Sequence, residues 1–231
     1  MGMFTVIAYI SKKVRSIGLI ICIGTLLVAS MARAADNATE VPPVIQIAGG
    51  IAAAFMIHEG AHALVAGLTG TSMDWKMGDV NQPISFTEHS KNDDRGLAVN
   101  SAGLLAQAGC SEFILYADKI DKNDSFIRGM MLWNILNPIF YAVDYWFIEK
   151  TNKINGNSFQ GDLSGVEFHS NKGTADIFAG TLVALAAFQA YRYAKTQSWA
   201  PEWLKNTEEL EHLSFTPLPS GGAMLAYTFR F

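Results

Sequence analysis

Four long apolar segments constrain what this chain can fold into. They cover residues 44–68, 97–117, 126–148 and 174–194. As a helix, each is long enough to cross a hydrocarbon layer of about 30 Å. Charged residues make up only 16% of the 231 residues, which is fewer than in an average soluble domain. The sequence therefore predicts a mainly α-helical fold, a polytopic membrane bundle of about four transmembrane helices.

The N-terminal residues 1–34 have the pattern of an export signal. Basic residues precede the apolar run 17–28, and Ala32 and Ala34 form a small-x-small cleavage site. The alternative is an uncleaved first membrane helix, for which the run is short, since a full span takes about 20 residues. We expect a signal peptide here, and therefore an exported or membrane protein.

The connecting segments divide the rest of the chain. Residues 35–195 are the expected membrane-embedded domain. Within it, the polar insert 69–96 has the alternation and turn residues of a small β-hairpin, and the Gly-, Asn- and Ser-rich segment 149–173 is typical of a loop. Residues 196–231 are expected to form a tail, with a short interfacial helix followed by a C-terminal β-hairpin around a Pro-Ser-Gly-Gly turn.

Charge and cysteine content exclude two kinds of interaction. The net charge is −4 and no run of basic residues is present, so no nucleic-acid partner is expected. The only two cysteines are Cys22, which lies in the leader, and Cys110. No disulfide is therefore available to the mature chain. The expected partners are the lipid bilayer and a membrane-protein substrate, while the sequence leaves the oligomeric state open.

The motif His58-Glu59-Gly60-Ala61-His62 places three ionisable side chains inside the first apolar segment. On a helix, histidines four residues apart point from one face and can reach one ion. Zinc binds imidazole nitrogen at about 2.0 to 2.1 Å and, in catalytic sites, keeps one position for water. Glu59 is placed to take the proton of that zinc-bound water. The alternative is a pair of neutral histidines that hydrogen-bond to neighbouring helices.

The cost of burying a charge favours the metal site. A charged side chain at the centre of a bilayer costs roughly 2.5 to 3.5 kcal/mol on insertion scales, so an unpaired Glu59 is not expected there. The sequence therefore predicts Zn²⁺ as a cofactor, with His58 and His62 as ligands and Glu59 as the catalytic base.

A catalytic zinc site needs a third protein ligand. Asp144 follows Asn134, Asn137 and Tyr141 in steps of three, four and three residues, which keeps all four within about 80° on one helix face. It also lies near the end of the third segment, at the expected level of the metal. Asp162, in a glycine-flanked stretch on the same side, is the rival ligand. The residue pattern leaves both open.

Two amide side chains are candidates for substrate binding. Gln107 shares a face of the second segment with Asn100 and Ser111, and Asn137 lies in the third segment. Such amides suit an extended substrate backbone or a tetrahedral oxyanion. They suit hydrogen bonds between membrane helices equally well, and Gly103 on the second segment permits close approach of another helix.

Together these motifs resemble the site-2-protease family of intramembrane zinc metalloproteases. HExxH lies in the first core helix, residues 102–107 are similar to the family's Ala-Gly-Pro-x-x-Asn element, and Asn137, Pro138 and Asp144 are similar to its third motif. The resemblance covers residues 44–148. The chain has Leu and Gln where the middle element has Pro and Asn, and a Tyr after Asp144 where the family usually has Gly.

The resemblance implies a zinc-dependent endopeptidase that hydrolyses peptide bonds in or near the membrane helices of other proteins. His58, His62 and Asp144 would hold zinc, and Glu59 would activate water. We expect an integral membrane protein of the bacterial inner membrane. The alternative function is a non-catalytic membrane scaffold or a metal-binding membrane protein.

Overall fold

The computed structural model describes residues 41–75, 84–86, 92–149, 161–206, 213–217 and 223–227. The predicted leader, 1–34, lies outside the described residues. Most of the structure is helical, which confirms the predicted class. The helices are α2 (Pro43–Thr69), α3 (Asp94–Tyr116), α4 (Ser125–Val143), the π-helix η1 (Asp144–Glu149), α5 (Asp162–His169), α6 (Lys172–Thr196) and α7 (Glu202–Lys205).

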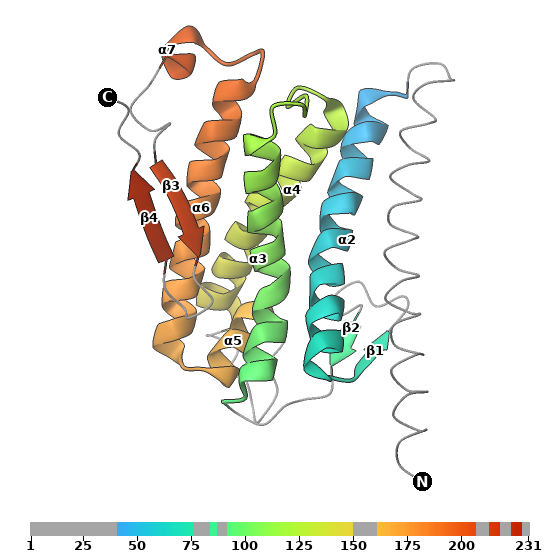
Figure 1. The fold of residues 1–231 in the computed structure, drawn as a ribbon, viewed down its shortest axis with the longest axis vertical. Coiled ribbons are helices and arrows are strands. Elements are labelled where there is room, and N and C mark those ends of the chain that lie inside the picture. The colour runs from blue at the N-terminus through green and yellow to red at the C-terminus, as the bar shows by residue number, and fades with distance from the viewer. Residues whose placement is uncertain are drawn as a thin grey trace.

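Four long helices run lengthwise beside one another, and the short helix α5 lies at one end of them (Figure 1). α2 packs most extensively against α4 and α3, and α6 packs against α4, α5 and α3. Each of the four apolar segments of the sequence corresponds to one of these long helices, α2, α3, α4 and α6. The arrangement brings the middle of α2 against the middle of α3.

Local sequence signals explain where the helices begin and end. Pro43 occupies the first turn of α2. A backbone N–H has no partner within the helix at this position, so proline costs no hydrogen bond there. The same helix ends at Gly70, whose φ of 72° is left-handed and whose N–H bonds to the Ala66 carbonyl oxygen. The Asp124 side chain caps α4 by accepting from two backbone N–H groups, and the Asn171 side chain caps α6 by accepting from the Thr174 N–H.

The crossing of α2 and α4 depends on two glycines. A Cβ atom on Gly50 would lie 2.0 Å from the Phe126 carbonyl oxygen, and one on Gly129 would lie 2.1 Å from the Ile47 carbonyl oxygen. Because both contacts are with backbone atoms, neither neighbour can rotate away. The two helices approach each other closely only because both positions lack a side chain.

Helix α5 corrects the loop predicted over 149–173. Within that segment, Asp162–His169 is helical. Leu163 and Val166 are each only 1% exposed, and both belong to the buried core at this end of the bundle. The Ser164 hydroxyl accepts a hydrogen bond from the Gly161 N–H at 3.0 Å. The glycine and serine content of this segment favours a loop, but packing of its apolar side chains against other helices stabilises a helix.

Short antiparallel strands account for the remaining elements. β1 (Met73–Trp75) pairs with β2 (Ile84–Phe86), and β3 (Leu213–Pro217) pairs with β4 (Ala223–Tyr227). The residues that connect the strands of each pair lie outside the described residues, so the two hairpins stay predictions.

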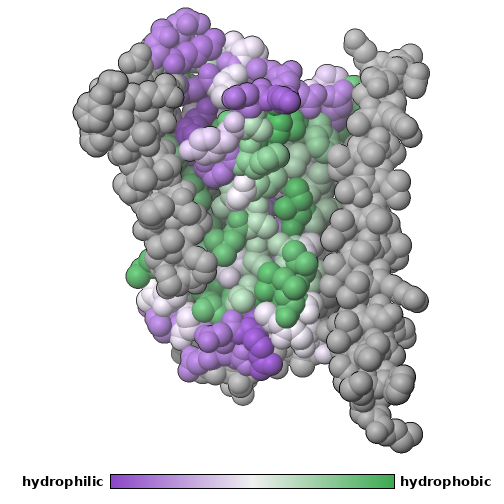
Figure 2. All heavy atoms as spheres, viewed as in Figure 1, coloured by the Kyte–Doolittle hydropathy of each residue, from purple (hydrophilic) through white to green (hydrophobic). Residues whose placement is uncertain are grey.

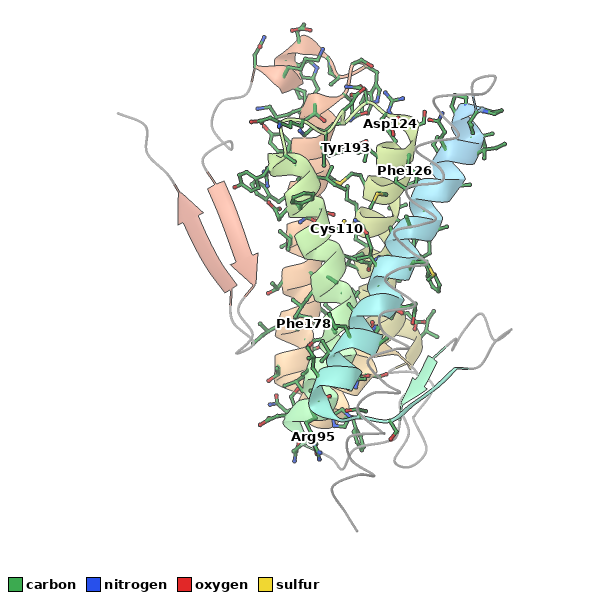
Figure 3. All side chains as sticks on the ribbon, turned by 45° about the vertical axis from the view of Figure 1, so that its right-hand side comes forward. Arg95, Cys110, Asp124, Phe126, Phe178 and Tyr193 are labelled. Carbon is green, nitrogen blue, oxygen red and sulfur yellow. The ribbon has the colours of Figure 1, made fainter. Side chains whose placement is uncertain are left out.

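Two helices, α2 and α6, are long and apolar enough to cross a membrane. On the face seen in Figure 2, hydrophobic residues gather over the middle of the helices and hydrophilic residues over both ends. Arg95 and Asp124 lie at these opposite ends (Figure 3). On this face the bundle is thus apolar between two polar ends.

Candidate metal centre

The two histidines of HExxH lie on the buried face of α2. Gly50, Ala54, His58, His62 and Ala66 are all buried and recur every four residues, so they form one stripe along the helix. His58 is 2% exposed and His62 is 3% exposed. Their Nε2 atoms lie 3.1 Å apart. The predicted pair of neighbouring imidazoles is therefore present in the structure.

Asp162, the first residue of α5, completes the cluster. Its Oδ2 atom lies 3.1 Å from His58 Nε2 and 3.2 Å from His62 Nε2. Among the described residues, the group of His, Cys, Asp and Glu side chains close enough to hold an ion consists of these three. Of the two aspartates that the sequence left open, the structure brings Asp162 to the histidines and leaves Asp144 out of the group.

The position of Asp144 follows from the helical phase of α4 and η1. Successive helical residues differ by about 100° in direction, so Asp144 and Tyr145 point to different parts of the helix surface. Tyr145 is the buried one, at 2% exposure, and Asp144 lies at the margin of the buried face. Tyr141, one turn earlier, does reach the site, because its ring stacks on His58 with centroids 5.7 Å apart.

Hydrogen bonds on the far side of each imidazole fix its tautomer. His62 Nδ1 lies 2.6 Å from the Val99 carbonyl oxygen, which can only accept, so Nδ1 carries the hydrogen. His58 Nδ1 lies 3.0 Å from Gln107 Oε1, which also accepts. In both neutral rings the Nε2 atom is then left with a lone pair. This is the arrangement typical of histidine ligands to metals.

The three converging atoms therefore all present lone pairs to one another. A single proton on one Nε2 atom forms a good hydrogen bond to only one of the other two atoms. The two atoms without a proton still face each other as acceptors. A divalent cation relieves all three contacts at once. Ligands about 2.1 Å from a tetrahedral zinc ion lie about 3.4 Å apart, and the observed separations of 3.1 to 3.2 Å are close to that value. The residues fit a zinc ion.

The charge on the third ligand also suits a cation. Burial alone would raise the pKa of the Asp162 carboxyl, but positive charge held at the imidazoles beside it, His62 above all, brings this pKa below its usual range. Asp162 is therefore a carboxylate. Glu59, which is half-buried, interacts electrostatically with the same three residues. It stands beside the cluster without being one of its three converging groups.

Gly103 on α3 provides the room for the two imidazoles. A Cβ atom at this position would lie 2.4 Å from His62 Nε2 and 2.7 Å from His58 Nε2. Sequence reasoning assigned Gly103 to helix packing in general and missed its contact with the ligand atoms. The signal was its spacing, because Val99, Gly103 and Gln107 recur every four residues and so line one face of α3.

The two amides predicted to bind substrate are bonded to each other. Asn137 Nδ2 donates to Gln107 Oε1 at 2.8 Å, and the same oxygen faces His58 Nδ1. Gln107 is fully buried and Asn137 is 7% exposed. These contacts make them positioning groups for His58, and their role in substrate binding stays a prediction.

The arrangement has the parts that metal-assisted hydrolysis requires, namely two imidazoles, a carboxylate ligand and a second carboxylate beside them. Comparison of the chain with family models, curated proteins and solved structures gives no match.

Proposed function

We propose that this chain is a zinc-dependent endopeptidase that hydrolyses peptide bonds in or near the membrane helices of other proteins. One observation carries the proposal: His58, His62 and Asp162 direct three lone pairs to one point, and Glu59 lies beside that point on the same apolar helix. The resemblance of the HExxH helix and of α3 and α4 to the site-2-protease family motifs supports the same reading.

The chemistry divides between the ion and the chain. Bound by His58, His62 and Asp162, zinc would supply a Lewis acid that polarises a carbonyl oxygen and acidifies water. Glu59 would accept the proton of the attacking water on its carboxylate and pass it to the leaving amine. Gln107 and Val99, through the two Nδ1 atoms, hold the imidazoles in their ligand tautomer.

A four-span membrane bundle is part of the proposal. Only 28% of the apolar window of α2 and 33% of that of α6 are buried, whereas a core helix of a soluble protein would be mostly buried. In α3, Asp94 and Arg95 lie in the first turn, and Glu112 is paired with Arg192 of α6 at 2.6 Å. The charges of α3 are therefore terminal or neutralised, as a membrane span requires.

Aromatic residues also support the proposed position of the bundle in a membrane. Trp199 and Trp203 follow the C-terminal end of α6 and are 66% and 75% exposed, as in the aromatic belts at membrane interfaces. The bacterial inner membrane stays the location predicted from the sequence.

The Glu59→Gln variant tests the catalytic proposal. Glutamine keeps the shape of the side chain and cannot accept the proton, so we expect bound zinc to be retained and turnover to fall by two or more orders of magnitude. Turnover is measured as new N-termini in membrane proteins of cells that produce the wild-type chain. Glu202→Gln, at an exposed position on α7, is the matched control and should behave as wild type.

The competing function is a non-catalytic, metal-binding scaffold. It predicts no difference between cells producing the Glu59→Gln variant and cells producing the wild type, either in the N-termini of their membrane proteins or in phenotype. That result, with zinc still bound, would overturn the protease proposal.

A further inference from the structure

A second group of buried polar side chains lies between α3 and α4, next to the histidine network. It consists of Gln107, Ser111 and Asn134, which we call the α3–α4 polar cluster. All three are 0% exposed. Among the described residues, Gln107 Nε2, Ser111 Oγ and both Nδ2 and Oδ1 of Asn134 have no hydrogen-bond partner. Leaving a buried polar group unpaired costs about 1 to 3 kcal/mol, so four such atoms need an explanation.

These atoms lie at two adjacent levels of the bundle. Gln107 and Asn137 are in contact across the two helices, which run in opposite directions (Figure 1). Ser111 lies one turn after Gln107, and Asn134 lies one turn before Asn137, so the two come level with each other. The Cys110 thiol, labelled on α3 in Figure 3, also interacts with Asn134, but a thiol is too weak a partner to satisfy an amide.

The kinds of atom present identify what binds there. Gln107 Nε2 and Asn134 Nδ2 donate, Asn134 Oδ1 accepts, and the Ser111 hydroxyl does either. A cation would satisfy only acceptors, and an apolar group would satisfy none of them. Water both donates and accepts, needs two to four polar partners and is small enough for a closed site. We propose that the α3–α4 polar cluster binds one or two internal water molecules.

This water has a specific effect on the metal centre, and the effect rests on the proposed function. Gln107 Oε1 faces His58 Nδ1. If the amide flipped, Nε2 would face that nitrogen, and His58 would move its hydrogen to Nε2, the atom that faces Asp162. Water that accepts from Gln107 Nε2 holds the amide in the orientation that leaves the His58 Nε2 lone pair available. Ser111 and Asn134, which bind this water, are therefore positioning residues.

A structure of the full chain in detergent, at a resolution that reveals ordered water, tests the site directly. We expect solvent density within hydrogen-bond distance of Gln107 Nε2 and of at least one atom of Ser111 or Asn134. Direct hydrogen bonds among the three side chains, with no density between them, would overturn the proposal.

Two variants test the effect on the metal centre. Ser111→Ala and Asn134→Leu remove water partners without adding charge, and we expect each to weaken zinc binding about tenfold, the lower end of the effect of second-shell residues. Affinity is measured by competition with a zinc chelator. Ser101→Ala is the matched control on α3, because its hydroxyl already bonds to the Leu97 carbonyl oxygen at 2.9 Å, and it should bind zinc as wild type does.

A spectroscopic readout separates this role from a general loss of packing. The ¹⁵N signals of His58 in the zinc-free protein should report hydrogen on Nδ1 in the wild type and a growing share on Nε2 in both variants. Folded variants that keep the wild-type tautomer and zinc affinity would overturn the positioning role. If the wild type itself binds no zinc, the proposed function fails, while the water density and the tautomer still decide this inference.

Discussion

At the scale of single residues, the site depends on where the hydrogens lie on two imidazoles. Val99 and Gln107 accept hydrogen bonds from the Nδ1 atoms. The Nε2 lone pairs therefore face Asp162 across 3.1 to 3.2 Å. A carbonyl oxygen, an amide and a glycine on α3 prepare this arrangement. The ligand atoms on α2 and α5 are therefore only part of the metal centre, and changes on α3 should alter metal binding.

Replacing Gly103 tests this dependence. In Gly103→Ala, the new Cβ would lie 2.4 Å from His62 Nε2, so an imidazole must turn away and we expect zinc binding to weaken at least tenfold. Gly109→Ala is the matched control, because a Cβ there meets nothing within 4 Å. Zinc affinity by chelator competition measures both. Equal, undiminished affinity in the two variants would show that Gly103 does not shape the site.

The residue pattern predicted part of this site. HExxH identified His58, Glu59 and His62 because helical spacing alone brings i and i+4 together. It favoured Asp144 and left Asp162 open as the rival ligand, since the choice depends on how α5 packs against α3 and α6. It proposed Gln107 and Asn137 for substrate binding or for hydrogen bonds between helices, and it could not place Gln107 beside His58, because no pattern in the sequence reveals which amide faces which imidazole.

At the scale of elements, the sequence predicted the long helices better than the short one. A run of about 20 apolar residues determines a helix without reference to the rest of the fold, whereas α5 has eight residues and is stabilised by the burial of Leu163 and Val166 in a core made by other helices. The missed helix is the element that carries Asp162. Local composition therefore failed at a point where the site depends on tertiary contacts.

The close crossing of α2 and α4 gives a prediction about stability. In Gly50→Ala the Cβ would overlap the Phe126 carbonyl oxygen at 2.0 Å, so the helices must separate, and overpacking of this kind costs about 1 to 3 kcal/mol. We expect a lower thermal unfolding midpoint in detergent. Gly180→Ala, where a Cβ meets nothing within 4 Å, should leave the midpoint unchanged or raise it. An unchanged midpoint in Gly50→Ala would contradict this description of the crossing.

At the scale of the whole molecule, the face seen in Figure 2 is apolar between two polar ends. Large exposed apolar side chains such as Met56, Leu64, Leu132 and Phe140 lie on α2 and α4, and large exposed apolar patches are rare on soluble monomers and typical of surfaces that contact a membrane or a partner. We predict that the protein stays in the membrane fraction after extraction with alkaline carbonate. Release into the supernatant would exclude an integral protein and with it the intramembrane substrate.

The central claim, a metal held by His58, His62 and Asp162, is tested most directly by the zinc content of the purified protein and of two matched variants, Asp162→Asn and Asp144→Asn. Both replace a carboxylate by an amide of the same shape, but only one of the two side chains belongs to the cluster. The account predicts one zinc per chain in the wild type and in Asp144→Asn, and little or none in Asp162→Asn. Full zinc content in Asp162→Asn, or its loss in Asp144→Asn alone, would contradict it.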